Sequence, residues 1–206
     1  MTYALTKYQN YQDYLEHCPL KDGNYRLLSS GEVIQLPPED DDNLLWAFEL
    51  KLLLSQLPGL RKLVRGNDTE IQVHPVGDGR MNRKPDVMVL RPEHRILFKK
   101  SRYSAIKLGM PAPIFVAELV SPGSESSDNY KRDYLWKREQ YQWWGIPEYW
   151  IVDRHREKVT VLNLEADLYG SNIGSNIYTE TEYTDDMTIK SVTFPTLSIT
   201  PRQMLD

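Results

Sequence analysis

The segment PIFVAELVSPG, residues 113–123, places one carboxylate, Glu118, inside an otherwise apolar run. Such a run, bounded by proline and glycine, is typical of a strand that is buried on both faces of a sheet. A buried carboxylate costs free energy unless another group compensates its charge. The segment therefore predicts a central strand, and it requires a partner for Glu118.

A second acid, Asp86, precedes another strand-like run in the segment KPDVMVL, residues 84–90. If the two strands pair, the carboxylates of Asp86 and Glu118 approach one point, where like charges repel and raise a pKa. A hard divalent cation such as Mg²⁺ would relieve that repulsion, activate water and stabilise a phosphoryl transition state. Alternatively, an arginine or backbone N–H groups hold each acid, which then has only a structural role.

The composition favours one globular domain in the cytoplasm. The 206 residues are 40% hydrophobic and 26% charged, and their net charge of −4 does not by itself indicate a nucleic-acid-binding surface, although a local basic patch is compatible with it. We expect no membrane span, because no run of about 18 apolar residues occurs, and the first residues lack the pattern of a secretory signal. The single cysteine, Cys18, excludes an internal disulfide and suits a reducing compartment.

The remaining patterns predict an α+β or α/β fold around a mixed sheet. Helices are expected over 44–57 and 129–145, with a short helix or ordered arm over 5–17. Strands are expected within 25–36, 69–76, 85–90, 114–120, 148–153 and 158–164, and turns with β-prone pieces from 168 onward. We expect a single domain with an N-terminal arm or helix (1–24), a core (25–160) and a β-rich C-terminal extension (161–206).

A long basic loop is expected between the strands of Asp86 and Glu118. With the residues just before Asp86 it carries nine basic side chains, namely Arg80, Arg83, Lys84, Arg91, Arg95, Lys99, Lys100, Arg102 and Lys107. Such residues bind phosphates of a nucleic acid and position it without reading its sequence. DNA is therefore the expected partner.

Four segments resemble the Uma2 family: KPDVMVL (84–90), FVAELVSPGS (115–124), RDYLWKREQYQWWGIPEYWIVD (132–153) and FPTLSITPRQMLD (194–206). These restriction-endonuclease-like proteins, abundant in cyanobacteria, have the PD-(D/E)XK nuclease fold, and the resemblance extends from about Glu32 to the C-terminus. It implies a mixed β-sheet flanked by helices, with additional β-hairpins. It also implies that Asp86 and Glu118 are the two metal-binding acids of the motif, with the backbone carbonyl of Leu119 as a further metal ligand.

The chain departs from the nuclease motif at Val120, where the motif has a lysine on the strand face of the second acid. The resemblance implies a replacement, Lys137, on the following helix. Asp133, Lys137 and Tyr141 are four residues apart and form one helical stripe. The catalytic hypothesis predicts that Lys137→Met loses cleavage but keeps Mg²⁺ affinity and thermal stability. The alternative is a solvent-exposed Asp133–Lys137 pair, whose loss leaves activity unchanged.

Other candidates carry weaker signals. Glu49 is either a further acid of the site or an exposed helix residue, and Glu70 faces either the site or solvent. Ser121 lacks the G-x-S-x-G setting of a serine hydrolase. The histidines show no zinc-like spacing; they are His17, His74, His94 and His155.

Three functions follow as hypotheses. The first is a Mg²⁺-dependent endonuclease that hydrolyses DNA, with Asp86, Glu118 and Lys137 as catalytic residues. The second is a catalytically inactive nucleic-acid-binding or accessory protein that keeps the nuclease fold, which Val120 favours. The third is a structural or interaction protein whose acids form core salt bridges. A homodimer is a further hypothesis, since nucleases that cut both strands commonly pair two sites about a two-fold axis.

Overall fold

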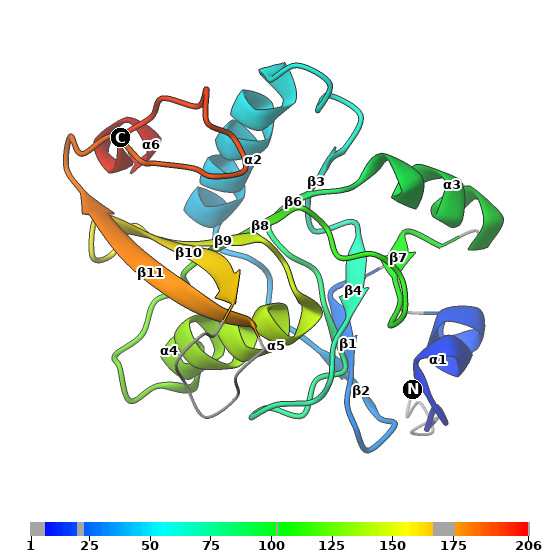
Figure 1. The fold of residues 1–206 in the computed structure, drawn as a ribbon. Coiled ribbons are helices and arrows are strands. Elements are labelled where there is room, and N and C mark those ends of the chain that lie inside the picture. The colour runs from blue at the N-terminus through cyan, green and yellow to red at the C-terminus, as the bar shows by residue number, and fades with distance from the viewer. Residues whose placement is uncertain (1–6, 20–22, 102, 167–175, 206) are drawn as a thin grey trace.

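The structure, a computed structural model, describes residues 7–19, 23–101, 103–166 and 176–205. Within these residues the main sheet has six strands in the order β11-β10-β9-β8-β6-β3 (Figure 1). The strands are β3 (Val64–Arg65), β6 (Val87–Val89), β8 (Phe115–Leu119), β9 (Glu148–Asp153), β10 (Lys158–Ala166) and β11 (Asn176–Thr184). β8 and β9 are parallel, and β6 pairs antiparallel with β8. The predicted mixed sheet is therefore confirmed.

The central position of the 113–123 segment explains its apolar composition. Every residue of β6, β8 and β9 is buried, because helices cover both faces of the sheet. In Figure 1, α2 (Asp41–Gln56) and α6 (Pro201–Leu205) lie on one face, and α4 (Asp128–Lys131) and α5 (Lys137–Trp144) lie on the other. A π-helical turn, η1 (Arg132–Trp136), joins α4 to α5. Side chains on both faces of β8 are thus removed from water.

Two smaller sheets lie beside the main one. The hairpin of β1 (Tyr25–Leu27) and β2 (Val33–Gln35) turns through Gly31, which has φ +85° and leaves no room for a Cβ beside the Tyr8 carbonyl. The other sheet has the order β5-β4-β7. Its strands are β4 (Glu70–Gln72), β5 (Asn82–Arg83) and β7 (Ala105–Ile106). The first helix of the described residues is α1 (Tyr11–His17). The hairpin confirms the two strands expected within 25–36.

The predicted helices form where their end signals lie. Asp40 is the N-cap of α2, and its side chain accepts hydrogen bonds from the backbone N–H groups of Asp42 and Asn43. The helix expected over 129–145 ends at Gly145, which adopts the left-handed conformation with φ +74°. None of the helices in the described ranges has both the length and the hydrophobicity that a membrane span requires.

The expected basic loop is partly wrong, because it contains the helix α3 (Pro92–Ser101). Proline is favoured at the first position of a helix, and His94 satisfies an end group of this one by accepting from the backbone N–H of Arg91 at 3.0 Å. Near the C-terminus, α6 was not predicted. The boundary that we expected at residue 160, between the core and the C-terminal extension, lies inside the strand β10. Arg102 and the turn segment 167–175 lie outside the described residues.

Asp153, at the end of β9, anchors the following turn. Its fully buried carboxylate accepts from the Tyr134 hydroxyl at 2.6 Å and from the backbone N–H of Arg156 at 3.0 Å, and it pairs with the Arg156 guanidinium at 2.8 Å. Burial raises the pKa of Asp153, but the hydrogen bonds of Tyr134 and Arg156 outweigh it and leave the pKa below its usual value. The folded chain therefore favours the ionised form.

We expect Asp153→Asn to lower the free energy of unfolding by about 2 kcal/mol near neutral pH, because charged hydrogen bonds are lost. For a carboxyl with a lowered folded pKa, the stabilisation is present above the unfolded pKa of about 3.9 and disappears as pH falls through the folded pKa. Denaturation at a series of pH values measures this. Equal losses at pH 7 and below pH 3 would contradict the prediction.

Candidate active site

Strand pairing brings the two acids to the same place. The register of β6 and β8 pairs Val87 with Ala117, so one further step places Asp86 opposite Glu118. The backbone N–H of Leu119 donates to Asp86 Oδ2 at 2.7 Å and fixes that carboxylate. Asp86, Glu118 and Leu119 line one pocket with a volume of about 200 Å³. The pairing that the sequence analysis required is therefore present.

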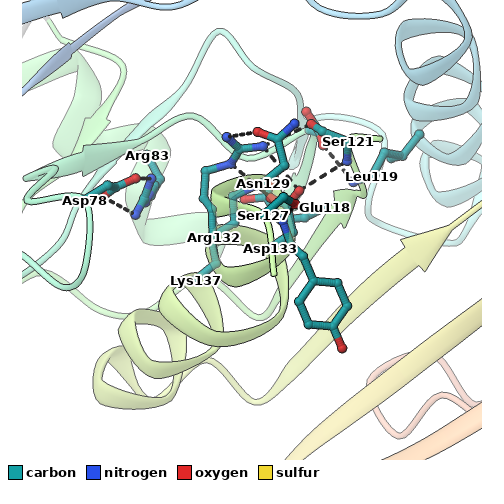
Figure 2. A network of polar contacts seen from close by, with 12 residues as sticks. Asp78, Arg83, Glu118, Leu119, Ser121, Ser127, Asn129, Arg132, Asp133 and Lys137 are labelled. Carbon is teal, nitrogen blue, oxygen red and sulfur yellow. Dashed lines mark hydrogen bonds and ion pairs between the residues drawn. The ribbon is translucent and has the colours of Figure 1, made fainter. Parts of the chain in front are cut away.

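Lys137 lies in the same pocket and not on a solvated helix face. Its Nζ is 2.9 Å from Glu118 Oε2 and 2.8 Å from Asp133 Oδ1, and its side chain is only 11% exposed (Figure 2). The Tyr141 hydroxyl donates to the other oxygen of Glu118 at 2.5 Å. The solvent-exposed pair is therefore wrong as a description of Asp133 and Lys137. The burial also removes the reason to expect that Lys137→Met leaves thermal stability unchanged.

The π turn η1 lies immediately before Lys137. The backbone N–H of Lys137 donates to the carbonyl of Arg132, five residues earlier, so this turn holds one residue more than an α-helical turn. Asp133 is fully buried at the base of the turn, where it also accepts from the backbone N–H of Ser121 at 3.2 Å. The loop after β8 and the helix are thus tied together beside Glu118. Single π turns are frequent at functional sites.

The surroundings of Asp86 disfavour its ionised form. Burial raises the pKa of Asp86 well above its usual range, and the nearby Glu118 raises it further. Burial lowers the pKa of Lys137, but Asp133, Glu118 and Asp86 outweigh it, so the pKa is raised and the ammonium stays charged. Burial likewise raises the pKa of Asp133, but Lys137 and Arg132 lower it below its usual value. The positive charges nearby therefore favour the ionised form of Asp133 strongly enough to outweigh its burial, and do not do so for Asp86.

The oxygen atoms of this pocket suit a hard cation. Asn43, a 4% exposed residue of α2, also lines the pocket, and its Oδ1 has no hydrogen-bond partner among the described residues. The described ranges hold no cluster of three or more His, Cys, Asp or Glu side chains that would bind a metal without other ligands. Mg²⁺ commonly takes only one or two carboxylates and completes its shell with water and substrate oxygens. Asp86, Glu118 and the unpaired Asn43 oxygen fit this pattern.

Six basic side chains line the pocket, together with the acids Glu39 and Asp40 and with apolar and polar residues around it. The basic side chains are Arg26, Arg80, Arg83, Lys84, Arg132 and Lys137. Three belong to the basic segment predicted from sequence, whereas its other described members do not line the pocket. Sequence reasoning missed Arg26 and Arg132. The position of Arg132 beside Asp133 in the helical stripe was a usable signal, but nothing in the sequence around Arg26 marks it.

Arg132 connects three segments around the pocket rim. Its guanidinium donates to Asn129 Oδ1 at 3.0 Å and to Ser121 Oγ at 3.1 Å, and its Nε lies 3.3 Å from Asp133 Oδ1 (Figure 2). Burial lowers the pKa of Arg132, but the Asp133 carboxylate outweighs it and leaves the pKa raised. These contacts hold the loop after β8 against the helix that carries Lys137.

Two weaker candidates lie elsewhere. Glu49 is exposed on α2 and does not line the pocket, which agrees with the simpler interpretation of this residue. Glu70 faces neither the pocket nor solvent: it is 4% exposed and accepts from the Tyr11 hydroxyl at 2.9 Å and from Asn82 Nδ2 at 2.8 Å. Its Oε1 is 3.5 Å from the Lys84 ammonium, so it acts behind the pocket wall.

Comparison with models of known protein families assigns the chain to a family. The model of the Uma2 family, described as "Putative restriction endonuclease", matches residues 11–202. The chain belongs to the Uma2 family. The resemblance seen in the four sequence segments is therefore confirmed, and Asp86, Glu118 and Lys137 all fall within the matched range of this Uma2 protein.

A solved structure agrees with the fold of the Uma2 protein. The chain is similar to a "putative nuclease belonging to DUF820" from Anabaena variabilis, with a TM-score of 0.62 and 13% sequence identity over 94% of this chain and 96% of that one. At this identity the similarity shows the fold alone, and it confirms the predicted fold class. No curated protein matches the chain.

Proposed function

We propose that this Uma2-family chain is a Mg²⁺-dependent endonuclease that hydrolyses phosphodiester bonds in DNA. The observation that carries the proposal is the meeting of Asp86, Glu118 and Lys137 in one pocket, with Lys137 in contact with Glu118. Paired carboxylates beside a cation are the groups that a metal-assisted displacement at phosphorus uses. The family match and the nuclease-family fold support the same chemistry.

The proposed cation site consists of Asp86, Glu118 and the backbone carbonyl of Leu119, with Asn43 Oδ1 as an additional oxygen donor. When bound, Mg²⁺ would supply Lewis acidity toward a phosphate oxygen and would acidify a water molecule. The Tyr141 hydroxyl and Lys137 hold both oxygens of Glu118, so the orientation of this carboxylate is set before substrate arrives. The backbone N–H of Leu119 does the same for Asp86.

In this proposal Lys137 acts as a charged group and not as a base. Its raised pKa keeps the ammonium protonated, so it donates hydrogen bonds and cannot accept the proton of the attacking water. A phosphodiester displacement builds negative charge on the phosphate oxygens, and a fixed, largely buried ammonium stabilises that charge. Asp133, one helical turn earlier, holds the Nζ of Lys137 in place. Lys137 thus takes the role that a lysine at position 120 has in the usual motif.

Binding of nucleic acid by the proposed enzyme is expected to be weak and mainly electrostatic. The net charge is −4, and the basic side chains that line the pocket, Arg80, Arg83 and Lys84 among them, form only a local patch. The logarithm of the affinity should therefore fall linearly and steeply with the logarithm of salt concentration, because bound counterions are released from DNA. Fluorescence anisotropy with labelled duplex DNA measures the slope. An affinity that is insensitive to salt would contradict this prediction.

Cleavage of supercoiled plasmid DNA tests the function. We expect nicking or linearisation that requires Mg²⁺, stops with EDTA and is absent from Asp86→Asn. Direct linearisation without accumulation of nicked circles is the product expected of a homodimer with two sites. A wild-type protein that binds Mg²⁺ and DNA without turnover would favour the catalytically inactive alternative. Absence of both binding and turnover would leave a structural role for the acids.

A further inference from the structure

The basic side chains of the pocket differ in how their charges are compensated. Five of them have a carboxylate within 4.0 Å: Arg80 and Arg83 pair with Asp78, Lys84 with Glu70, and Arg132 and Lys137 with Asp133. Arg26 is the exception, since no carboxylate of the described residues forms an ion pair with it. The hydrogen bond of its side chain runs from Nη1 to the carbonyl of the preceding residue, Tyr25, at 2.8 Å.

Arg26 is nonetheless buried. It lies in the middle of β1 and is 6% exposed, beside the fully buried Leu27. Burial lowers the pKa of Arg26, and the nearby Glu70 and Glu118 do not restore it to its usual value. A guanidinium has five N–H donors, and burying such a group without an anion is unfavourable. The folded chain therefore keeps at the pocket wall a buried guanidinium that no carboxylate of the described residues contacts directly.

We infer that Arg26 is the residue that binds the substrate phosphate, with its guanidinium donating two hydrogen bonds to non-bridging oxygens of the phosphodiester. This inference rests on the proposed function. The fork of a guanidinium matches the geometry of a phosphate, and the donors of Arg26 are not occupied by a carboxylate. Arg83 shows the contrast, because Asp78 already accepts from both its Nη1 and Nη2 at 3.1 and 3.0 Å.

The size of the pocket bears on what Arg26 can bind. The pocket has a volume of about 200 Å³, which is enough for one phosphate group. Arg26 and the carboxylates Asp86 and Glu118 line the same pocket, so a phosphate held there would lie between the Arg26 guanidinium and the proposed metal site. The group that Arg26 would bind is therefore the phosphate of one phosphodiester link.

The test compares Arg26→Met with Arg61→Met. Substitution of Arg61 by methionine removes the same single positive charge. Arg61, however, lies on the surface outside the pocket and forms no ion pair in the described ranges. Binding of labelled duplex DNA in EDTA should weaken tenfold or more in Arg26→Met and less than threefold in Arg61→Met. Arg26→Lys, which keeps the charge and loses the fork, should lie between them. Mg²⁺ affinity measured by calorimetry should not fall in any of the three.

A second measurement separates this inference from the proposed function. Inorganic phosphate should raise the melting temperature of the wild type above its value in chloride at equal ionic strength, and Arg26→Met should lose that increment. A phosphate increment that depends on Arg26, in a protein that cleaves no DNA, would support the anion site and overturn the nuclease. Normal Mg²⁺-dependent cleavage and DNA binding by Arg26→Met or Arg26→Lys would overturn the role of Arg26 and leave the nuclease standing.

Discussion

Replacement of Lys137 by methionine is expected to lower the rate of Mg²⁺-dependent cleavage by at least about 100-fold, the usual effect of removing one fixed donor to a transition-state charge. The loss follows from position, since Nζ lies 2.9 Å from Glu118 in the pocket where the phosphate would be attacked. No basic side chain replaces it on the strand, because position 120 is a buried valine. Single-turnover cleavage of a labelled duplex measures the effect.

The same substitution is expected to destabilise the protein. Removal of the ammonium leaves Asp133 and Glu118 without their shared partner, and breaking a buried ion pair costs about 3 kcal/mol. For a chain of this size the melting temperature should fall by roughly 6–12 °C. Activity must therefore be compared below both melting temperatures, with Lys137→Arg as the control that keeps the charge. A stable Lys137→Met protein that cleaves at the wild-type rate would remove Lys137 from the mechanism.

Asp86→Asn is expected to abolish cleavage and Mg²⁺ binding while making the metal-free protein more stable. Burial and the charge of Glu118 raise the pKa of Asp86, so the folded chain binds this proton more tightly than the unfolded chain does. Stability therefore falls as pH rises from the unfolded pKa, about 3.9, through the raised folded pKa. Asparagine removes that penalty at neutral pH and still accepts from the backbone N–H of Leu119. We expect a gain on the order of 1 kcal/mol, or about 2–4 °C.

Thermal denaturation in EDTA and in Mg²⁺ measures both effects. In EDTA the variant should melt above the wild type at pH 7, and in Mg²⁺ the wild type alone should gain stability, because only its folded state binds the ion. Asp153→Asn is the matched control, since the pKa of Asp153 is lowered and the same substitution there should destabilise at neutral pH. A metal-free Asp86→Asn protein that melts below the wild type would assign Asp86 a structural role.

Local patterns account for the elements of the fold. The apolar runs of 85–90 and 114–120 form β6 and β8, because only strands buried under helices on both faces tolerate so few polar residues. The caps at Asp40 and Gly145 mark ends of α2 and α5, since these signals act within one turn of the chain. The helix α3 was not predicted, because its sequence has many basic residues and few apolar residues at helical spacing.

The site was predictable only in part. The acids could be paired from sequence because Glu118 lies in a strand with a clear pattern, Asp86 directly precedes another, and adjacent strands often pair. The surroundings of Lys137 could not be predicted. Spacing shows that Asp133, Lys137 and Tyr141 share one helix face, but it does not show whether that face contacts β8 or water. Contact with Glu118, nineteen residues earlier, is a property of packing.

The sequence by itself determined the strand that follows Asp86, the strand that carries Glu118, the helix that carries Lys137, and membership of the Uma2 family. Only the tertiary structure decided that Lys137 is buried between two carboxylates and that Arg26 and Asn43 line the same pocket. The physical reason is that secondary structure follows from short-range periodicity and end groups, whereas the compensation of a charge depends on side chains from distant segments. Arg26 is 92 residues from Glu118 in the chain, and only folding makes them walls of one pocket.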